Sequence, residues 1–123
     1  MYYLACVNGN TVGGLGFMVI NDIEWGFFKG SIRLLILSLL EESSMHGYQI
    51  LKRIEEFFGS KPKLSTIYTI LAELERKGLV KSNMGLKKYY SLTDNGKRIL
   101  HEIRRRNEEK IKRLISTILG SHK

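Results

Sequence analysis

The chain has 123 residues, which suits one domain and is too short for two independent cores. Its 43% hydrophobic and 26% charged residues argue against a disordered chain, and no run approaches the ~20 apolar residues that a membrane-spanning helix needs. Twenty Lys and Arg against twelve Asp and Glu leave a net charge of +8, which favours a polyanionic partner: nucleic acid first, an anionic membrane surface second.

The reactive side chains indicate neither metal nor catalytic chemistry. Cys6 is the only cysteine, so it forms no intramolecular disulfide, and a reducing cytoplasm is the expected location. The three histidines and Cys6 do not have the spacing of metal ligands, and His46 is interpreted as a structural hydrogen-bonding residue. The sequence contains no nucleophile motif, glycine-rich phosphate loop or convincing carboxylate pair. We therefore expect no enzymatic activity, no metal and no cofactor.

The first 25 residues differ from the rest and are treated as an N-terminal extension. Residues 1–28 contain no Lys or Arg and five of the twelve glycines. Two apolar runs flank Asn8-Gly9, a common two-residue turn, so residues 2–20 are predicted to form a β-hairpin. The alternatives are a flexible arm, or a stretch upstream of a translation start at Met18. The segment lacks the basic start of a secretory signal, and no function is assigned to it.

Two helices are predicted after this extension. Ser31 is the expected N-cap of the first, and its apolar residues recur at helical spacing as far as Leu40, which predicts a helix that lies in the core. The second runs from Tyr48 to Phe58 and ends at Gly59, the usual residue type for a left-handed C-terminal cap.

A third helix and a hairpin follow. Pro62 precedes a helix whose apolar stripe runs from Leu64 to Leu74, and Lys77-Gly78 supplies a basic last turn and a C-terminal cap. Residues 79–83 and 87–92 are β-prone and flank a short turn, so they are predicted to form a hairpin with a basic second strand.

The last predicted element is one long helix. Thr93 is its expected cap, and no proline interrupts the chain from Asp94 to Leu119, a length of up to about 39 Å. We predict that this helix pairs with its counterpart in a second copy, mainly near its ends because its middle is highly charged. The predicted pairing residues are Leu100, Ile103, Asn107, Ile111, Leu114 and Ile118. Alternatively, the basic helix lies on an anionic membrane or binds a partner helix.

This order of elements predicts a mainly α fold with a small β-hairpin wing, the winged helix-turn-helix. In that architecture the third helix enters the major groove of double-stranded DNA. The N-terminal half of this helix carries short or flat side chains that allow close approach to base edges: Ser65, Thr66, Tyr68 and Thr69. Its acids, Glu73 and Glu75, fall in the other half, away from the positive N-terminus. The alternative is an ordinary amphipathic helix with a small-residue face.

Basic residues bracket the third helix on both sides. Lys61 and Lys63 precede it, and Lys81, Lys87 and Lys88 mark the hairpin. These positions suit contacts with the phosphate backbone, although charged runs are also common on solvated surfaces and successive hairpin residues face opposite sides.

Three short motifs occur in order along the chain: His46-Gly47-Tyr48, Ile67-Tyr68 and YYSLTDNG at residues 89–96. Together, over about residues 26–100, they resemble the PadR family of winged-helix transcriptional regulators. The resemblance implies a dimeric, repressor-like DNA-binding protein with a long C-terminal dimerisation helix. It also implies that Tyr68 and the hairpin lysines touch DNA and that Tyr48 lies near the DNA backbone.

The chain departs from the family pattern at two places. Leu64-Ser65-Thr66 stands where Pro and Gly are usual, so the recognition helix is expected to start a residue or two differently. The hairpin tip, residues 84–86, lacks the usual arginine, which predicts fewer wing contacts. The resemblance further implies a possible pocket for a flat hydrophobic effector near Trp25, although packing in the core or dimer interface is the preferred interpretation.

The sequence therefore predicts three regions: an extension at 1–25, a winged helix-turn-helix at 26–93 and a dimerisation helix at 94–123. The predicted function is regulation of transcription, most simply repression, by a homodimer on a palindromic operator. The alternatives are a winged-helix module that binds protein and a nonspecific or architectural DNA-binding protein.

Overall fold

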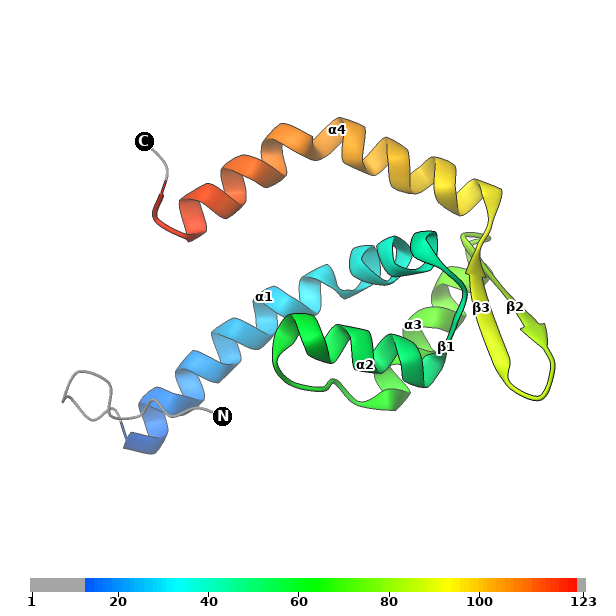
Figure 1. Ribbon diagram of the computed structural model, residues 1–123. Helices are drawn as coiled ribbons and strands as arrows, with labels where there is room; N and C mark the ends of the chain where they lie inside the picture. Colours follow the sequence, from blue (N-terminus) through cyan, green and yellow to red (C-terminus); the bar gives the residue numbers. More distant parts are fainter. Residues whose placement is uncertain (1–12, 122–123) are drawn as a thin grey trace. The chain divides into compact units, whose positions relative to one another are not determined.

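The computed structural model describes residues 13–121 and shows four helices and three strands within them (Figure 1). The elements are α1 (Gly13–Glu42), β1 (Met45–His46), α2 (Gly47–Phe58), α3 (Leu64–Arg76), β2 (Val80–Met84), β3 (Lys88–Leu92) and α4 (Asp94–Ile118). The chain divides into two compact units, residues 1–33 and 34–123. Every element from β1 onward, together with the C-terminal end of α1, belongs to the second unit.

The N-terminal extension is helical where it is described, so the predicted hairpin over residues 2–20 is wrong from residue 13 onward. Its first part, residues 2–12, lies outside the described residues. The physical reason is the helical spacing of four half-buried side chains, which outweighs the turn signal at Asn8-Gly9. These side chains are Phe17, Asn21, Trp25 and Phe28.

Ser31 lies inside α1 and is not its N-cap. Its hydroxyl donates a hydrogen bond to the Phe28 carbonyl oxygen at 2.8 Å, the bond that a serine makes in the middle of a helix. The helix therefore continues through the predicted boundary at residues 25 and 26, and it ends at Glu42, two residues after the last apolar residue of the predicted run, Leu40.

α2 has the expected C-terminus and a more elaborate N-terminus. Gly59 is left-handed, with φ 78°, and its N–H donates to the Glu55 carbonyl. At the other end, His46 Nδ1 accepts from the Gln49 N–H at 3.3 Å, while the Gln49 side chain accepts from the His46 N–H at 3.0 Å. This reciprocal capping box confirms a structural hydrogen-bonding role for His46.

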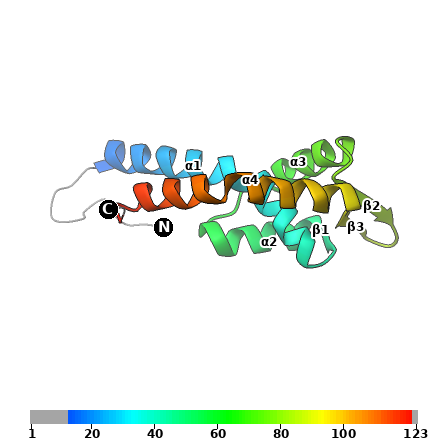
Figure 2. The same cartoon turned by 90° about the horizontal axis from the view of Figure 1, so that it is seen from above.

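The core of the second unit is aliphatic and is assembled from one face of each helix. Its fully buried side chains include Ile36, Leu39, Ile50, Ile54, Ile67, Leu71 and Leu100. Burial of each such side chain contributes about 1.5–3 kcal/mol. Seen from above, α2 and α3 lie to either side of the line of α4 (Figure 2). The structure confirms the predicted winged helix-turn-helix. The core could be located from the sequence because apolar residues recur at helical spacing in each helix.

The wing is part of a three-stranded antiparallel sheet with strand order β1-β3-β2. β2 and β3 pair from Val80 opposite Leu92 to Met84 opposite Lys88, which confirms the predicted hairpin. The third strand was not predicted. β1 pairs with the middle of β3 and ties the link between α1 and α2 to the wing.

A junction around Thr93 connects the wing to α4. The Thr93 hydroxyl donates to the Gly78 carbonyl at 2.7 Å and accepts from the Gly96 N–H at 2.9 Å, so the predicted cap is confirmed. The Thr93 N–H donates to the Leu79 carbonyl at 3.1 Å. Only Gly96 and Leu100 of α4 are buried, both near its start. Among the described helices, none combines the length and apolar character needed to cross a membrane.

We predict that Gly96→Ala lowers the free energy of unfolding by about 1–3 kcal/mol, the range for forcing atoms into a filled space. The new Cβ would overlap the Leu79 carbonyl oxygen and lie 2.9 Å from Leu92 Cδ1. Urea unfolding at a fixed protein concentration, followed by circular dichroism, measures the change. The control is Gly30→Ala in α1, where a Cβ meets no atom within 4 Å. Because alanine is the better helix former, Gly30→Ala is expected to stabilise by up to ~1 kcal/mol. Equal effects of the two substitutions would contradict the close-packed junction.

Candidate nucleic-acid interface

α3 presents a polar face opposite its buried stripe. Ser65, Tyr68 and Thr69 are exposed on this face, and Thr66 is half-buried beside them. The Thr69 hydroxyl donates to the Ser65 carbonyl at 2.9 Å, which directs its methyl group outward. All four residues predicted to lie nearest the bases are therefore accessible: three are exposed and Thr66 is half-buried.

The two acids of α3 have partners in its C-terminal half. Glu73 pairs with Lys77 at 3.2 Å, one turn further along the helix. Glu75 accepts a hydrogen bond from Ser82 of β2 at 2.8 Å. The N-terminal half of α3 is thus left without a carboxylate, and the positive end of the helix macrodipole is unopposed there.

Tyr68 is held in place by a glycine of the neighbouring helix. A Cβ built on Gly47, the first residue of α2, would lie 2.5 Å from Tyr68 Cε1 and 2.7 Å from its hydroxyl oxygen. The ring edge therefore rests directly on the N-terminus of α2, while 44% of the residue stays exposed. Two of the sequence motifs, His46-Gly47-Tyr48 and Ile67-Tyr68, are the two sides of this contact.

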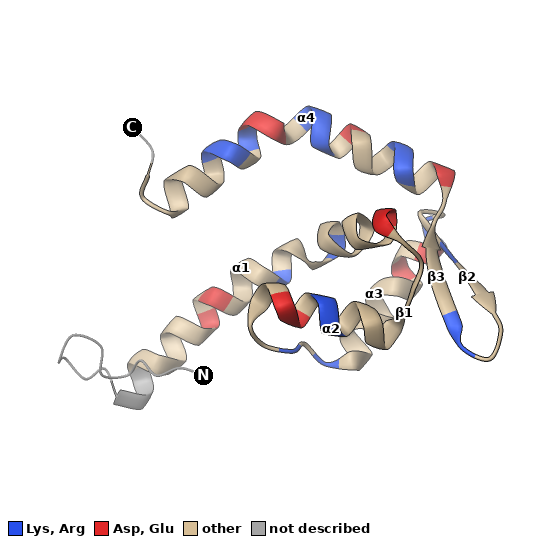
Figure 3. Cartoon of the chain, viewed as in Figure 1, with Lys and Arg blue, Asp and Glu red and all other residues tan. Residues whose placement is uncertain are grey.

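Exposed lysines lie before α3 and on the wing. Lys61 and Lys63 are exposed in the connection from α2, and Lys63 is the N-cap residue of α3. Figure 3 shows this basic connection and the basic hairpin, with acidic colour confined to the far part of α3. Lys87, in the hairpin turn, and Lys88, at the start of β3, are both exposed.

Lys88 and Lys87 lie on different sides of the wing. The Lys88 ammonium lies 5.6 Å from the ring centroid of Tyr90, which is buried against the core. Burial raises the pKa of Tyr90, so its phenol is neutral beside the lysine. Lys87 instead lines a surface hollow on the α2 side.

This hollow is formed by the link before α2, the first turns of α2 and the wing. Its lining residues are Ser43, Ser44, Met45, His46, Tyr48, Gln49, Lys52, Arg53 and Lys87. Tyr48 and Lys87, each predicted to lie at the DNA, thus line the same hollow, and the structure adds Lys52, whose ammonium lies 6.0 Å from the Tyr48 ring centroid. The four-residue spacing between Tyr48 and Lys52 was a signal that sequence reasoning missed. The neighbouring Arg53 forms ion pairs with Glu42 and Glu56, each at a distance of 3.4 Å.

The predicted pairing residues of α4 fall into three groups. Leu100 is fully buried within the protomer, so it cannot reach a partner, and that part of the prediction is corrected. Ile103 and Asn107 are half-buried, and the Asn107 side chain donates to the Ile103 carbonyl at 2.8 Å. Further along, Ile111, Leu114 and Ile118 are exposed, and two apolar residues outside the prediction, Ile115 and Leu119, extend them into an apolar row that is 37–73% exposed.

The described part of the chain contains no candidate site for a metal ion. Within residues 13–121 no group of three or more His, Cys, Asp or Glu side chains is arranged to hold a metal ion. His46 is engaged in the cap of α2, and His101 Nε2 lies 3.1 Å from a Glu41 oxygen.

Comparison with known proteins identifies related sequences. Residues 36–102 match the profile of the PadR-like family of transcriptional regulators. The chain is 31% identical over 99 residues to the transcriptional regulator YqjI of Escherichia coli K12, and the match covers 77% of this chain and 48% of that protein. The chain thus spans about half the length of this curated relative.

Solved structures with similar folds include two proteins of the same family. A PadR family transcription regulator from Clostridium difficile R20291 has a TM-score of 0.62 and 35% identity, covering 73% of this chain and 99% of its own. Bacillus subtilis PadR, solved in complex with operator DNA, has a TM-score of 0.50 and 35% identity, covering 57% of this chain and 44% of its own. These matches confirm the resemblance predicted from the motifs, and the family is one of regulators rather than enzymes.

We predict that Gly47→Ala displaces the Tyr68 ring and destabilises the protein, whereas the same substitution in a Tyr68→Ala background is neutral or stabilising. The reversal follows because the ring no longer opposes the new methyl group and alanine is a better helix former than glycine. Urea unfolding of the four proteins gives the coupling energy, and the Tyr68 ring resonances report the displacement. A Gly47→Ala effect that is the same in both backgrounds would contradict the contact.

Proposed function

Because the chain belongs to the PadR-like family of transcriptional regulators, we propose that it binds operator DNA as a homodimer and represses transcription by occluding a promoter. The observation that carries this proposal is the polar N-terminal half of α3, which lies between two sets of exposed lysines. A cytoplasmic location belongs to the same proposal.

Base recognition is assigned to the start of α3. Ser65, Tyr68 and Thr69 project from its exposed face, and short side chains allow the helix backbone to approach base edges in the major groove. The outward methyl of Thr69 suits contact with a thymine methyl, while the Ser65 hydroxyl can donate or accept. Thr66, being half-buried, is placed at the edge of this contact.

Phosphate contacts are assigned to the lysines on both sides of α3. Lys61 and Lys63 would hold one stretch of backbone, and Lys87 and Lys88 of the wing another. The hollow that joins Tyr48, Lys52 and Lys87 offers an aromatic hydroxyl and two ammonium groups to the same backbone. Polar and cationic side chains on this surface favour DNA over a protein partner, which would require an apolar face.

Dimerisation is assigned to the C-terminal half of α4. Its exposed apolar row continues the half-buried Ile103 and gives an apolar stripe on an otherwise highly charged helix, with the half-buried amide of Asn107 between them. A two-fold axis through paired α4 helices would present two copies of α3 to successive major grooves, about 34 Å apart.

Selection from a pool of random duplexes tests the proposal directly. Repeated binding and amplification with the full chain is expected to enrich a site with two inverted half-sites. Fluorescence anisotropy should then show one dimer per site and binding at least about 1000-fold tighter than to unselected duplex at the same salt concentration. Equal, weak binding to all duplexes would replace the operator with nonspecific DNA binding, and absence of binding would leave a protein partner as the function of the module.

We predict that the double substitution Lys87→Ala/Lys88→Ala weakens binding to all DNA sequences alike. Loss of two phosphate contacts in each protomer, four in the dimer, should reduce the slope of log affinity against log salt by roughly 3.6. Anisotropy titrations across a salt series measure the slope. The control, Lys110→Ala/Arg113→Ala, removes the same charge from exposed positions on α4 and is expected to leave the slope nearly unchanged. If the two double variants behave alike, only the net charge matters and the wing makes no phosphate contact.

We predict that Leu114→Asp converts the dimer to a folded monomer. The Leu114 side chain is 55% exposed in the protomer, so a charge there leaves the protomer core intact and opposes only the pairing of two apolar faces. Sedimentation equilibrium measures the mass, and circular dichroism checks the fold. Thr117→Asp adds the same charge to the next turn of α4, at the edge of the apolar row rather than within it, and is expected to stay dimeric. A dimer that survives Leu114→Asp would place the interface elsewhere.

A further inference from the structure

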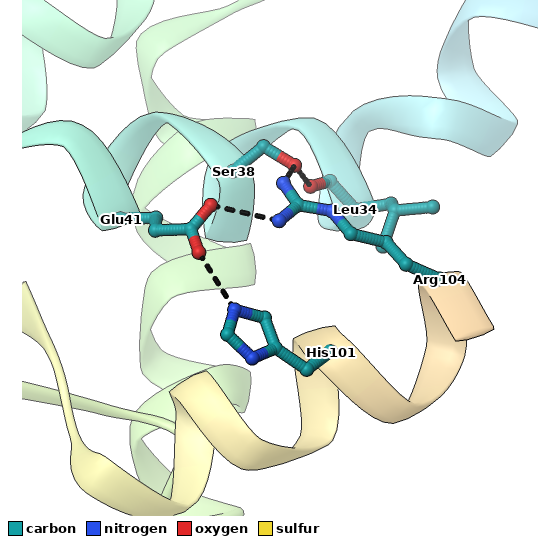
Figure 4. Close-up of polar contacts among 5 residues, drawn as sticks. All are labelled: Leu34, Ser38, Glu41, His101 and Arg104. Carbon is teal, nitrogen blue, oxygen red and sulfur yellow. Dashed lines mark hydrogen bonds and ion pairs between the residues drawn. The ribbon is translucent and has the colours of Figure 1, made fainter.

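The side chain of Glu41, one residue before the end of α1, is the centre of a polar cluster that reaches α4. Arg104 Nη1 donates to Glu41 Oε1 at 2.9 Å, and His101 Nε2 lies 3.1 Å from Glu41 Oε2. Arg104 Nη2 also donates to the Ser38 hydroxyl at 3.2 Å, and that hydroxyl donates to the Leu34 carbonyl at 2.9 Å (Figure 4). One carboxylate thus holds two consecutive turns of α4 against the last turns of α1.

The cluster lies at the point where α4 leaves the core. Leu100 is the last buried residue of this helix, and residues 108–115 are all exposed. Hydrogen bonding from Arg104, and then from His101, lowers the pKa of Glu41 below its ordinary value of 4.5, so the carboxylate is ionised at neutral pH. The Glu41 side chain is 30% exposed and that of Arg104 is 45% exposed, so the ion pair is open to screening by water and salt.

The direction of α4 has a large effect at its far end. From Arg104 to Ile118 the helix extends for about 21 Å, so a tilt of about 10° at the cluster moves the apolar row by about 4 Å. One base pair of DNA advances by about 3.4 Å along the axis and rotates the groove by about 34°. At the far end of α4, the displacement from a tilt of this size is therefore comparable with the rise of one base pair between the half-sites.

We propose that Glu41 is a positioning residue that fixes the direction of α4 relative to the winged domain and thereby sets the half-site spacing that the dimer accepts. This assignment rests on the proposed function. Leu100 anchors the start of α4 by burial, which permits rotation about that point, and the paired bonds from Glu41 to His101 and Arg104 remove that freedom. Glu41 itself touches no base or phosphate in this arrangement.

Glu41→Gln tests the assignment, with Glu42→Gln as the matched control. Glu42 is the next residue of α1 and pairs with Arg53 of α2 at 3.4 Å, so its loss removes a comparable charge without touching α4. Residual dipolar couplings from the full chain give separate alignment tensors for the strands and helices of residues 45–92 and for residues 104–118 of α4. We expect equal tensors in the wild type and in Glu42→Gln, and a reduced or rotated α4 tensor in Glu41→Gln.

The second readout uses synthetic operators in which the selected half-sites are moved apart or together by one base pair. The wild type and Glu42→Gln are expected to prefer the original spacing. In Glu41→Gln that preference should fall by about threefold or more, the size expected from losing one exposed ion pair in each protomer. Affinity for an isolated half-site should not change, because the α3 surface is untouched.

Each result decides one part of the assignment. Unchanged tensors in Glu41→Gln overturn the role of Glu41 in fixing α4, whatever happens to DNA binding. Changed tensors with an unchanged spacing preference overturn the link to half-site spacing. If the wild type enriches no paired half-sites, the proposed function and the spacing role fail together, and the tensors still decide whether Glu41 fixes the helix.

Discussion

The hydrogen bonds of Thr93 connect α3, the wing and α4. These are the elements that would have to keep fixed relative positions to bind a nucleic acid. The Thr93 hydroxyl donates to the Gly78 carbonyl and the Thr93 N–H donates to the Leu79 carbonyl, both just after α3. The same hydroxyl accepts from the Gly96 N–H and so caps α4. The absence of a side chain at Gly96 lets α4 approach the Leu79 carbonyl closely. The end of α3, the end of the wing and the start of α4 are thus fixed at one point, and the aliphatic core packs the other elements of residues 34–123 around it.

The surface built on this frame separates its charges along α3. Carboxylates are placed in the C-terminal half and are satisfied there by Lys77 and Ser82, so they neither repel a polyanion near the N-terminus nor attract the lysines of the wing. Tyr68 is positioned by packing rather than by a hydrogen bond, because its ring lies directly against Gly47. Of the polar residues on this surface, Tyr68 is thus restrained by packing and Thr69 by its hydrogen bond to the Ser65 carbonyl before any ligand binds.

Sequence reasoning succeeded where a local pattern agreed with the tertiary structure. Apolar spacing located α2, α3, α4 and the core, and single residues such as Gly59 and Thr93 located their ends. It failed where a local signal competed with a longer one, as in α1, or where an element depends on its neighbours. A two-residue strand such as β1 exists only because β3 lies beside it, and periodicity along α4 cannot distinguish Leu100, buried by its own protomer, from Leu114, which is exposed. The hollow at Tyr48 is likewise made by three segments that meet only in the fold.

The short strand β1 also affects the behaviour of the protein at high concentration. Strand edges with unpaired amides recruit strands from other molecules, and open-ended assemblies grow from them. Here one edge of the sheet is only two residues long and passes straight into a helix, while the other edge, β2, carries the exposed Lys81 and Asn83. Neither edge is a good template for strand addition. In the proposed two-fold assembly, the apolar row of α4 would therefore be covered, and the edges of the described sheet would offer no second route to fibrous aggregation.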